Sequence, residues 1–138
     1  MNAKQYLSQV IHIDQRIDNK LEQLQRLRES STRATATLSD MPRPDSPDLQ
    51  QIETTVAKII DLERDINRDI DLLVDLKAEV RRVIGALTNP DQQLILEMRY
   101  LCYKPWTAIM EALEISETSV YRIHGEALKK IVIPEKRE

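Results

Sequence analysis

The stretch from Pro105 to Ile131 reads PWTAIMEALEISETSVYRIHGEALKKI, and its pattern decides how the C-terminal part of the chain folds. Residues 106–113 carry apolar side chains four positions apart, which predicts a short helix with one apolar face. Residues 114–116 interrupt this pattern, and Ser116 is a favourable N-cap for a second helix. We therefore predict two short helices joined by a tight turn, the arrangement of a helix-turn-helix.

The second helix of this pair is predicted to have a core face and an outward face. Apolar residues at steps of three or four form the core face: Val120, Ile123, Ala127, Leu128 and Ile131. The outward face holds the residues that a recognition helix would turn toward the major groove of DNA: Glu117, Thr118, Tyr121, Arg122 and Lys129. Thr118 and the amides that follow Ser116 would meet backbone phosphate, with support from the start of the preceding helix. The supporting residues there are Lys104 and Thr107. Alternatively, the helices only pack together and bind no nucleic acid.

The composition predicts helices throughout the chain. Its 138 residues include no Phe, one Trp and two Gly, and 31% of them are charged. A chain that is poor in aromatic residues and glycine but rich in charge is typical of long helices with a narrow aliphatic seam. We expect an all-α fold with no β-structure of consequence.

Residues 1–87 are predicted to form an antiparallel coiled-coil hairpin with its turn at 40–47. Seam residues of the first helix recur every three or four positions, with Ser31 filling the one polar slot: Tyr6, Val10, Ile13, Ile17, Leu21, Leu24, Leu27, Ala34 and Leu38. Three prolines within 40–47 end this helix, and Pro47 suits the first position of the next one. The second seam has a mean step of about 3.5, the coiled-coil period. Its residues are Leu49, Ile52, Val56, Ile59, Leu62, Ile66, Ile70, Leu73, Leu76, Val80, Val83 and Leu87.

Charged residues suggest how the two helices align. A turn centred near residue 43 or 44 would set Arg16 beside Asp71, and the same alignment would set Arg26 beside Asp61. Both pairs have opposite charges, which favours a hairpin within one chain over a parallel dimer, although each exposed pair adds little stability. Acidic residues also recur four positions apart on the second helix, in two rows that are expected to face solvent, away from DNA: Asp61, Asp65 and Asp69, and Asp71, Asp75 and Glu79.

Some apolar residues fall outside the two seams: Leu7, Ile11, Ile60, Val74 and Ile84. A stripe this wide implies a further partner. The partner is either the C-terminal domain or a second copy of the hairpin, and we favour a homodimer.

The segment GALTNP at 85–90 is expected to mark the domain boundary, with a helix-turn-helix domain over 88–131 and a charged tail over 132–138. The first helix of that domain is predicted over 91–103. Its inward residues are Leu94, Ile95, Met98 and Leu101.

The charge distribution weighs against purely electrostatic DNA binding. Residues 1–87 hold 13 basic and 15 acidic groups, and residues 88–138 hold 7 and 8. A domain that binds mainly by neutralising phosphates should show an excess of Lys and Arg. Binding therefore requires a local basic face whose acidic neighbours point elsewhere.

Other chemistry is not expected from this sequence. His12 and His124 have no His or Cys partner at metal-ligand spacing, and the chain has no glycine-rich phosphate loop. We predict no enzyme, no metal and no cofactor. Cys102, the single cysteine, lies between Leu101 and Tyr103 and is predicted to fill the core. With no signal peptide and no apolar run long enough for a membrane span, a soluble, cytoplasmic protein of a bacterium or phage-infected cell is expected.

Residues 87–131 resemble the region-4 domain of bacterial sigma factors and its relatives in phage transcription regulators. The resemblance rests on LILEMRY at 94–100, LCYKP at 101–105, WTAIMEAL at 106–113 and SVYRIHGEALKKI at 119–131. It implies a helix-turn-helix that reads promoter DNA or docks on RNA polymerase. With its long helical N-terminal part, the chain is similar to small phage proteins grouped with late-gene activators of the RinA and ArpU kind.

Two residues depart from this family pattern. Glu114 stands where the family usually has glycine, which is favoured in a turn that needs a positive φ. Met110 stands where the family usually has a small residue, at the closest approach of the two helices. Either the turn is built differently, or the helices lie slightly further apart.

Three functions are consistent with the sequence. The first is a phage-type transcription regulator that binds double-stranded DNA, with the hairpin used for dimerisation or docking. The second is a protein interaction module that binds RNA polymerase or another transcription or replication factor without reading DNA. The third is a packaging protein like small terminase subunits, which combine a helix-turn-helix with helical oligomerisation segments.

Overall fold

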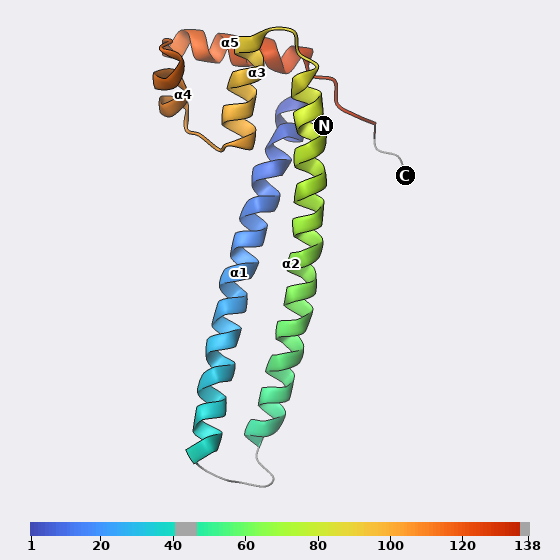
Figure 1. Ribbon diagram of the computed structural model, residues 1–138, viewed down its shortest axis with the longest axis vertical. Coiled ribbons are helices and arrows are strands. Elements are labelled where there is room, and N and C mark those ends of the chain that lie inside the picture. Colours follow the sequence, from blue (N-terminus) through green and yellow to red (C-terminus); the bar gives the residue numbers. More distant parts are fainter. Residues whose placement is uncertain (41–46, 136–138) are drawn as a thin grey trace. The chain divides into compact units, whose positions relative to one another are not determined.

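The computed structural model of this chain describes the backbone of residues 1–40 and 47–135 and the side chains of residues 1–33 and 49–135. These described residues form helices and no strand, which confirms the prediction of an all-α fold (Figure 1). The elements in chain order are α1 (Ala3–Asp40), α2 (Pro47–Gly85), α3 (Pro90–Leu96), the π-helical segment η1 (Glu97–Leu101), α4 (Trp106–Leu113) and α5 (Glu117–Lys130).

The starts of the long helices follow from local sequence signals. At the first turn of α1, Asn2 Oδ1 accepts a hydrogen bond from the Gln5 amide at 2.8 Å, and Gln5 Oε1 accepts one from the Asn2 amide at 3.0 Å. This reciprocal pair is a capping box, so α1 begins a few residues before the predicted seam. Helix α2 begins at Pro47, as predicted. The predicted turn at 40–47 and the seam positions Ala34 and Leu38 lie outside the described side chains.

The chain divides into two compact units. The first unit comprises Met1–Ile13 and Leu73–Glu138, and the second comprises Asp14–Leu72. The first unit thus combines the N-terminal end of α1, the C-terminal end of α2 and all later helices. Its packing joins the segments on either side of the predicted boundary after residue 87.

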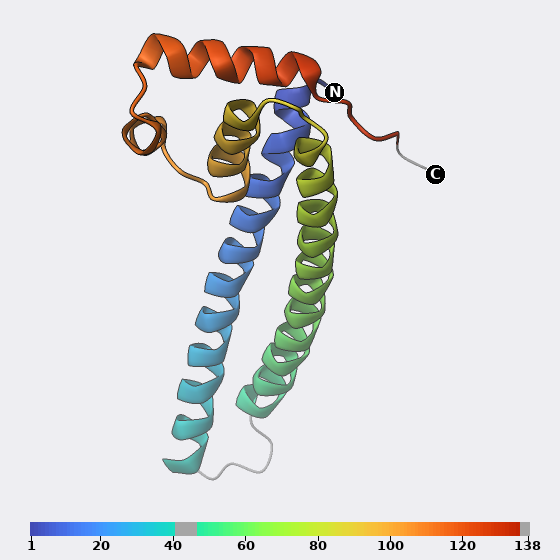
Figure 2. The same ribbon diagram turned by 45° about the horizontal axis from the view of Figure 1, so that its top comes forward.

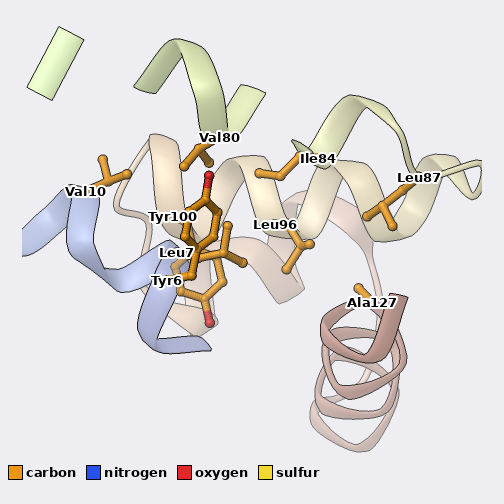
Figure 3. Close-up of a cluster of buried hydrophobic side chains, with 9 residues drawn as sticks. All are labelled: Tyr6, Leu7, Val10, Val80, Ile84, Leu87, Leu96, Tyr100 and Ala127. Carbon is orange, nitrogen blue, oxygen red and sulfur yellow. The ribbon is translucent and has the colours of Figure 1, made fainter. Parts of the chain in front are cut away.

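The first unit has a hydrophobic core built from α1, α2, α3, η1 and α5 (Figure 3). The core residues are Tyr6, Leu7, Val10, Val80, Ile84, Leu87, Leu96, Tyr100 and Ala127. Leu7 and Ile84 were expected to need a partner beyond the two long helices, and both are fully buried in this cluster. The C-terminal helices therefore supply the cover for this end of the apolar stripe.

A second, smaller cluster holds the last helices of the same unit together. Ile95 and Met98 meet Ile109 of α4 and Val120 of α5 there. Because Leu96 and Tyr100 join the first cluster, α3 and η1 bury two different faces.

The predicted inward set of the 91–103 helix was partly wrong. Leu94 is 40% exposed, whereas Leu96 and Tyr100, which were not predicted, are buried. The physical reason is twofold: the helix packs on two sides, and its last turn changes to the wider π form over Glu97–Leu101, which shifts the positions that follow. Cys102 comes directly after this segment and is exposed, so its predicted place in the core was wrong.

In the second unit, α1 and α2 run side by side in opposite directions (Figures 1 and 2). Arg16 of α1 pairs with Asp69 of α2 at 3.0 Å, and further along α1, Arg28 pairs with Glu63. Since the position on α2 decreases as the position on α1 increases, this part is antiparallel. Among the side chains described for this unit, the buried apolar residues are Ile17, Leu24 and Ile66.

The ion pairs across this unit differ from the predicted ones. Arg16 meets Asp69 instead of Asp71, and Arg26 pairs with Glu22 on its own helix instead of with Asp61. An exposed arginine finds a carboxylate four residues away as readily as one on a neighbouring helix, so sequence spacing alone does not choose between them.

Asp69 is the largest correction in the second unit. It was predicted on the solvated face, yet it is only 8% exposed and accepts hydrogen bonds from both Arg16 and Lys20. The hydrogen bond from Lys20 and the nearby Arg16 hold the pKa of Asp69 below its usual value. Two cations satisfy this buried carboxylate, which makes its burial tolerable.

Several predicted seam residues are exposed instead: Leu21, Leu49, Val56 and Ile70. Ile60 and Val74, for which a further partner was predicted, are also exposed, and that partner stays a prediction. None of the described helices combines the length and the apolar character that a membrane span requires.

Candidate nucleic-acid interface

Helix α4, a three-residue turn and α5 form the centre of the candidate interface. The turn ends α4 through two backbone hydrogen bonds, from the Ile115 amide to the Met110 carbonyl at 3.1 Å and from the Glu114 amide to the Glu111 carbonyl at 3.3 Å. This pattern is a Schellman motif, and Met110 and Ile115 both pack against the second core cluster. The connection is therefore tight and apolar on its inner side.

Glu114 takes the left-handed conformation in this turn, with φ 55° and ψ 45°. A residue with a Cβ is strained there, which is why glycine is favoured at such a position. The sequence left two possibilities, a turn with a different backbone or helices lying slightly further apart, and the first of these is not needed. The backbone takes the form that suits glycine, with Glu114 in its place.

Helix α5 starts with the predicted cap. Ser116 Oγ accepts a hydrogen bond from the Ser119 amide at 3.1 Å. The amides of the first turn of an α-helix have no partners within the helix, so Glu117 and Thr118 begin α5 at an end of positive dipole character. Thr118 is exposed at this end.

Along α5, the core face and the outward face separate cleanly. Val120, His124 and Ala127 are buried, as the apolar spacing predicted for the first and last of them. The opposite face carries Thr118, Arg122, Gly125 and Lys129, at steps of three or four residues. We call these four residues the outward stripe. Arg122 and Lys129 are exposed and Gly125 is half-buried.

Two glutamates flank the outward stripe. Glu126 lies on one side, with its carboxylate 4.0 Å from Arg122 in an exposed pair. Glu117 lies on the other side, in the first turn. The four residues of the outward stripe therefore include two cations and no acidic residue.

An aromatic and basic cluster lies beside the start of α5. Tyr121, 45% exposed, meets the ring of Trp106 edge to face, with centroids 5.3 Å apart. The guanidinium carbon Cζ of Arg99 lies 4.6 Å from the Trp106 centroid, within cation–π range, and Arg99 also donates a hydrogen bond to the Lys104 carbonyl at 3.1 Å. Tyr121 is thus held in place by Trp106, which is in turn covered by a cation.

Sequence reasoning missed Arg99 and Trp106 as neighbours of the predicted site. Trp106 begins α4, while Arg99 lies in the π-helical segment seven positions earlier. The π turn and the loop between the two residues interrupt the helical period, so their spacing in the sequence does not predict the contact.

The two remaining predicted residues lie near this cluster in the chain. Lys104 is exposed, and its backbone is fixed by its amide, which donates to the Met98 carbonyl at 3.0 Å. Thr107 is exposed in the first turn of α4. A partner as large as DNA can contact Lys104, Thr107 and the outward stripe together without any contact among these side chains.

His124 anchors α5 on its buried side. Its Nε2 lies 2.7 Å from the hydroxyl of Tyr100, and its ring meets Trp106 edge to face at 4.7 Å between centroids. Burial, together with the cations Lys4 and Arg99, lowers the pKa of His124 from 6.5 to about 4. The side chain is therefore neutral at physiological pH and holds α5 against η1.

The site is thus an exposed, locally cationic helix face supported by a tight turn and two core clusters, on an all-α chain. This chain belongs to the family described as "Protein of unknown function (DUF1492)", whose model matches residues 49–132. The match takes in nearly all of α2 and everything from α3 to α5. Neither the curated proteins nor the solved structures gave a match.

Proposed function

We propose that this chain is a phage-type transcription regulator that binds double-stranded DNA through α4, the turn and α5, with α1 and α2 serving for dimerisation or docking. One observation carries the proposal: Arg122 and Lys129 are both exposed on the outward stripe of α5, opposite its buried residues Val120, His124 and Ala127. A helix that is fixed on one side and cationic on the other is suited to entering a major groove.

The positions of the charges on α5 support DNA binding, although the composition of the domain shows no excess of basic residues. Residues 88–138 have no basic excess, yet Glu117 and Glu126 lie beside the stripe and not on it. The contact of Arg122 with Glu126 is exposed and 4.0 Å long, so it holds the guanidinium only weakly. Arg122 is therefore free to exchange this carboxylate for a phosphate, a stronger charge-assisted partner.

The start of α5 supplies further contacts for the same ligand. Thr118 and the first-turn amides would bind backbone phosphate, since a helix N-terminus favours anions. Tyr121, held by Trp106, presents its ring beside them and would contact a base edge or a sugar. Lys104 and Thr107 would extend the contact to a neighbouring phosphate.

Gel-shift titrations against phage genomic fragments at two salt concentrations test the proposal. Arg122→Ala and Lys129→Ala should each weaken binding and reduce the slope of log Kd against log salt concentration by about one, because one phosphate fewer is neutralised. Lys58→Ala is the matched control, because Lys58 is an exposed cation on α2 in the second unit. Binding that stays undetectable at low salt, or equally weakened binding in all three variants, would refute the proposal.

A second candidate is a protein interaction module, favoured by the apolar residues that α2 exposes in the second unit. Val56 and Ile60 are 42% and 45% exposed and four residues apart on one helix face. Co-purification with bacterial RNA polymerase after nuclease treatment, abolished in a Val56→Ser/Ile60→Ser variant, would support it.

The third function, a packaging protein like small terminase subunits, is separated from the other two by light scattering. A packaging protein should assemble into a large ring.

A further inference from the structure

The outward stripe of α5 contains a glycine that the packing of the chain does not require. Gly125 lies in the interior of α5 and does not have a positive φ. A Cβ added to Gly125 would meet no heavy atom within 4 Å outside its own stretch of helix. Alanine would therefore fit the folded chain. It would also favour the helix, because glycine loses more backbone freedom than alanine when a helix forms.

The position of Gly125 on α5 suggests what its missing side chain makes room for. Arg122 lies one turn before it and Lys129 one turn after it, on the same stripe. These two cations are about 10 Å apart along the helix axis. Between Arg122 and Lys129, Gly125 has no side chain to cover the helix backbone, so a ligand can approach the backbone closely at this point.

Resting on the proposed function, we propose that Gly125 is the point of closest approach between α5 and the sugar–phosphate backbone of duplex DNA. A phosphate group lies over the bare helix at Gly125 and is held between Arg122 and Lys129. A side chain at position 125 would push this phosphate away from both cations. Compared with alanine, glycine at position 125 thus favours DNA binding and lowers the stability of the helix.

The charges around Gly125 favour a polyanion over a partner helix. Small residues also allow two helices to pack closely, but here such packing would take Arg122 and Lys129 out of water and would need a carboxylate on the partner opposite each of them. Phosphates satisfy both cations directly and release counterions. DNA is therefore the occupant that the stripe selects.

Gly125→Ala is the direct test, with Gly85→Ala as its matched control. Gly85 is the other glycine of the chain. It ends α2 instead of lying on α5, and a Cβ added to it would likewise meet no heavy atom within 4 Å outside its own stretch of helix. A fluorescent random-sequence duplex at about 50 mM salt is titrated with each protein, and anisotropy gives the Kd. Gly125→Ala should weaken binding about tenfold while raising Tm by about 3 °C. Gly85→Ala should leave the Kd within about twofold of the wild type.

A larger side chain strengthens the test. Gly125→Gln adds a neutral, helix-favouring side chain and should weaken binding further than alanine does. Circular dichroism establishes that each variant is folded, and Gly125→Ala alone decides the question if the glutamine variant is not.

Two other results separate the failure of this inference from that of the proposed function. If the wild-type protein does not bind the duplex, the proposed function fails and this inference fails with it. If the wild type binds and Arg122→Ala weakens binding, but Gly125→Ala binds as tightly as the wild type, only the inference at Gly125 is overturned. Altered self-association of Gly125→Ala in light scattering, with unchanged DNA binding, would also overturn it and assign the glycine to a contact between two copies.

Discussion

Acidification should destabilise the first unit through one buried side chain, His124. Its imidazole is hydrogen-bonded to Tyr100 at 2.7 Å and meets the edge of Trp106. Burial, with a smaller contribution from the cations Lys4 and Arg99, lowers the pKa of His124 from 6.5 to about 4. The folded chain therefore resists taking up a proton that the unfolded chain accepts.

The sign and size of the effect follow from this difference in pKa. Above about pH 6.5, His124 is neutral in both states and adds no pH dependence. As the pH falls from 6.5 toward 4, the unfolded chain is protonated first, so the free energy of unfolding decreases. The full difference corresponds to a ceiling of about 3 kcal/mol. Because the ring is not fully shielded from solvent, we expect a loss of about 1 to 2 kcal/mol at about pH 4.5.

Urea unfolding followed by tryptophan fluorescence measures this loss, since Trp106 is the single Trp and lies against His124. Titrations at about pH 7 and about pH 4.5 are compared for the wild type, His124→Gln and His12→Gln. Glutamine keeps a hydrogen-bonding group near Tyr100 but does not titrate, and His12 is an exposed control. The loss on acidification should be smaller in His124→Gln than in the other two proteins. An equal loss in all three would refute the reasoning.

Two further substitutions probe strain and charge burial. Glu114→Gly should raise the free energy of unfolding by about 1 kcal/mol, because glycine adopts the φ of 55° without strain; calorimetry showing no increase would mean that the turn stores no strain. Asp69→Asn should lower the stability of the second unit by about 1 kcal/mol, because Arg16 and Lys20 lose their shared carboxylate. Asp61→Asn, at an exposed site on the same helix, is the control for urea titrations followed by circular dichroism, and equal effects of the two changes would contradict the role given to Asp69.

Much of the fold was predictable because its signals are local. The start of α2 at Pro47, the cap of α5 at Ser116 and the burial of Val120 and Ala127 all follow from residue types and their spacing. Such signals act within one or two helical turns. They need no knowledge of which other segment lies nearby.

The errors arose where distant segments meet. Cys102 was assigned to the core from its apolar neighbours in the sequence, but it directly follows the π-helical segment and faces solvent. Leu94 was assigned inward from one helical period, whereas α3 and η1 pack on two sides and bury Leu96 and Tyr100. A single periodic face cannot describe a helix that contributes to two clusters.

The candidate site was predicted more completely than the ion pairs were. The outward residues of α5 follow from its core face, since one face of a helix fixes the other. Arg99 and Trp106 were missed, because a loop and a π turn bring them together. Whether this face binds DNA stays a prediction, which the substitutions at Arg122 and Gly125 test.

An all-α chain, the start of α2, the cap of α5 and the core face of α5 could be read from the sequence, because proline, capping groups and apolar spacing act locally. Three features became visible only in the folded chain: Asp69 is buried between two cations, Leu7 and Ile84 are covered within the first unit, and Arg99 lies over Trp106. Those features depend on the alignment of segments far apart in the chain. A shift of two residues or one π turn exchanges the side chains that meet there, and local sequence patterns do not record such a shift.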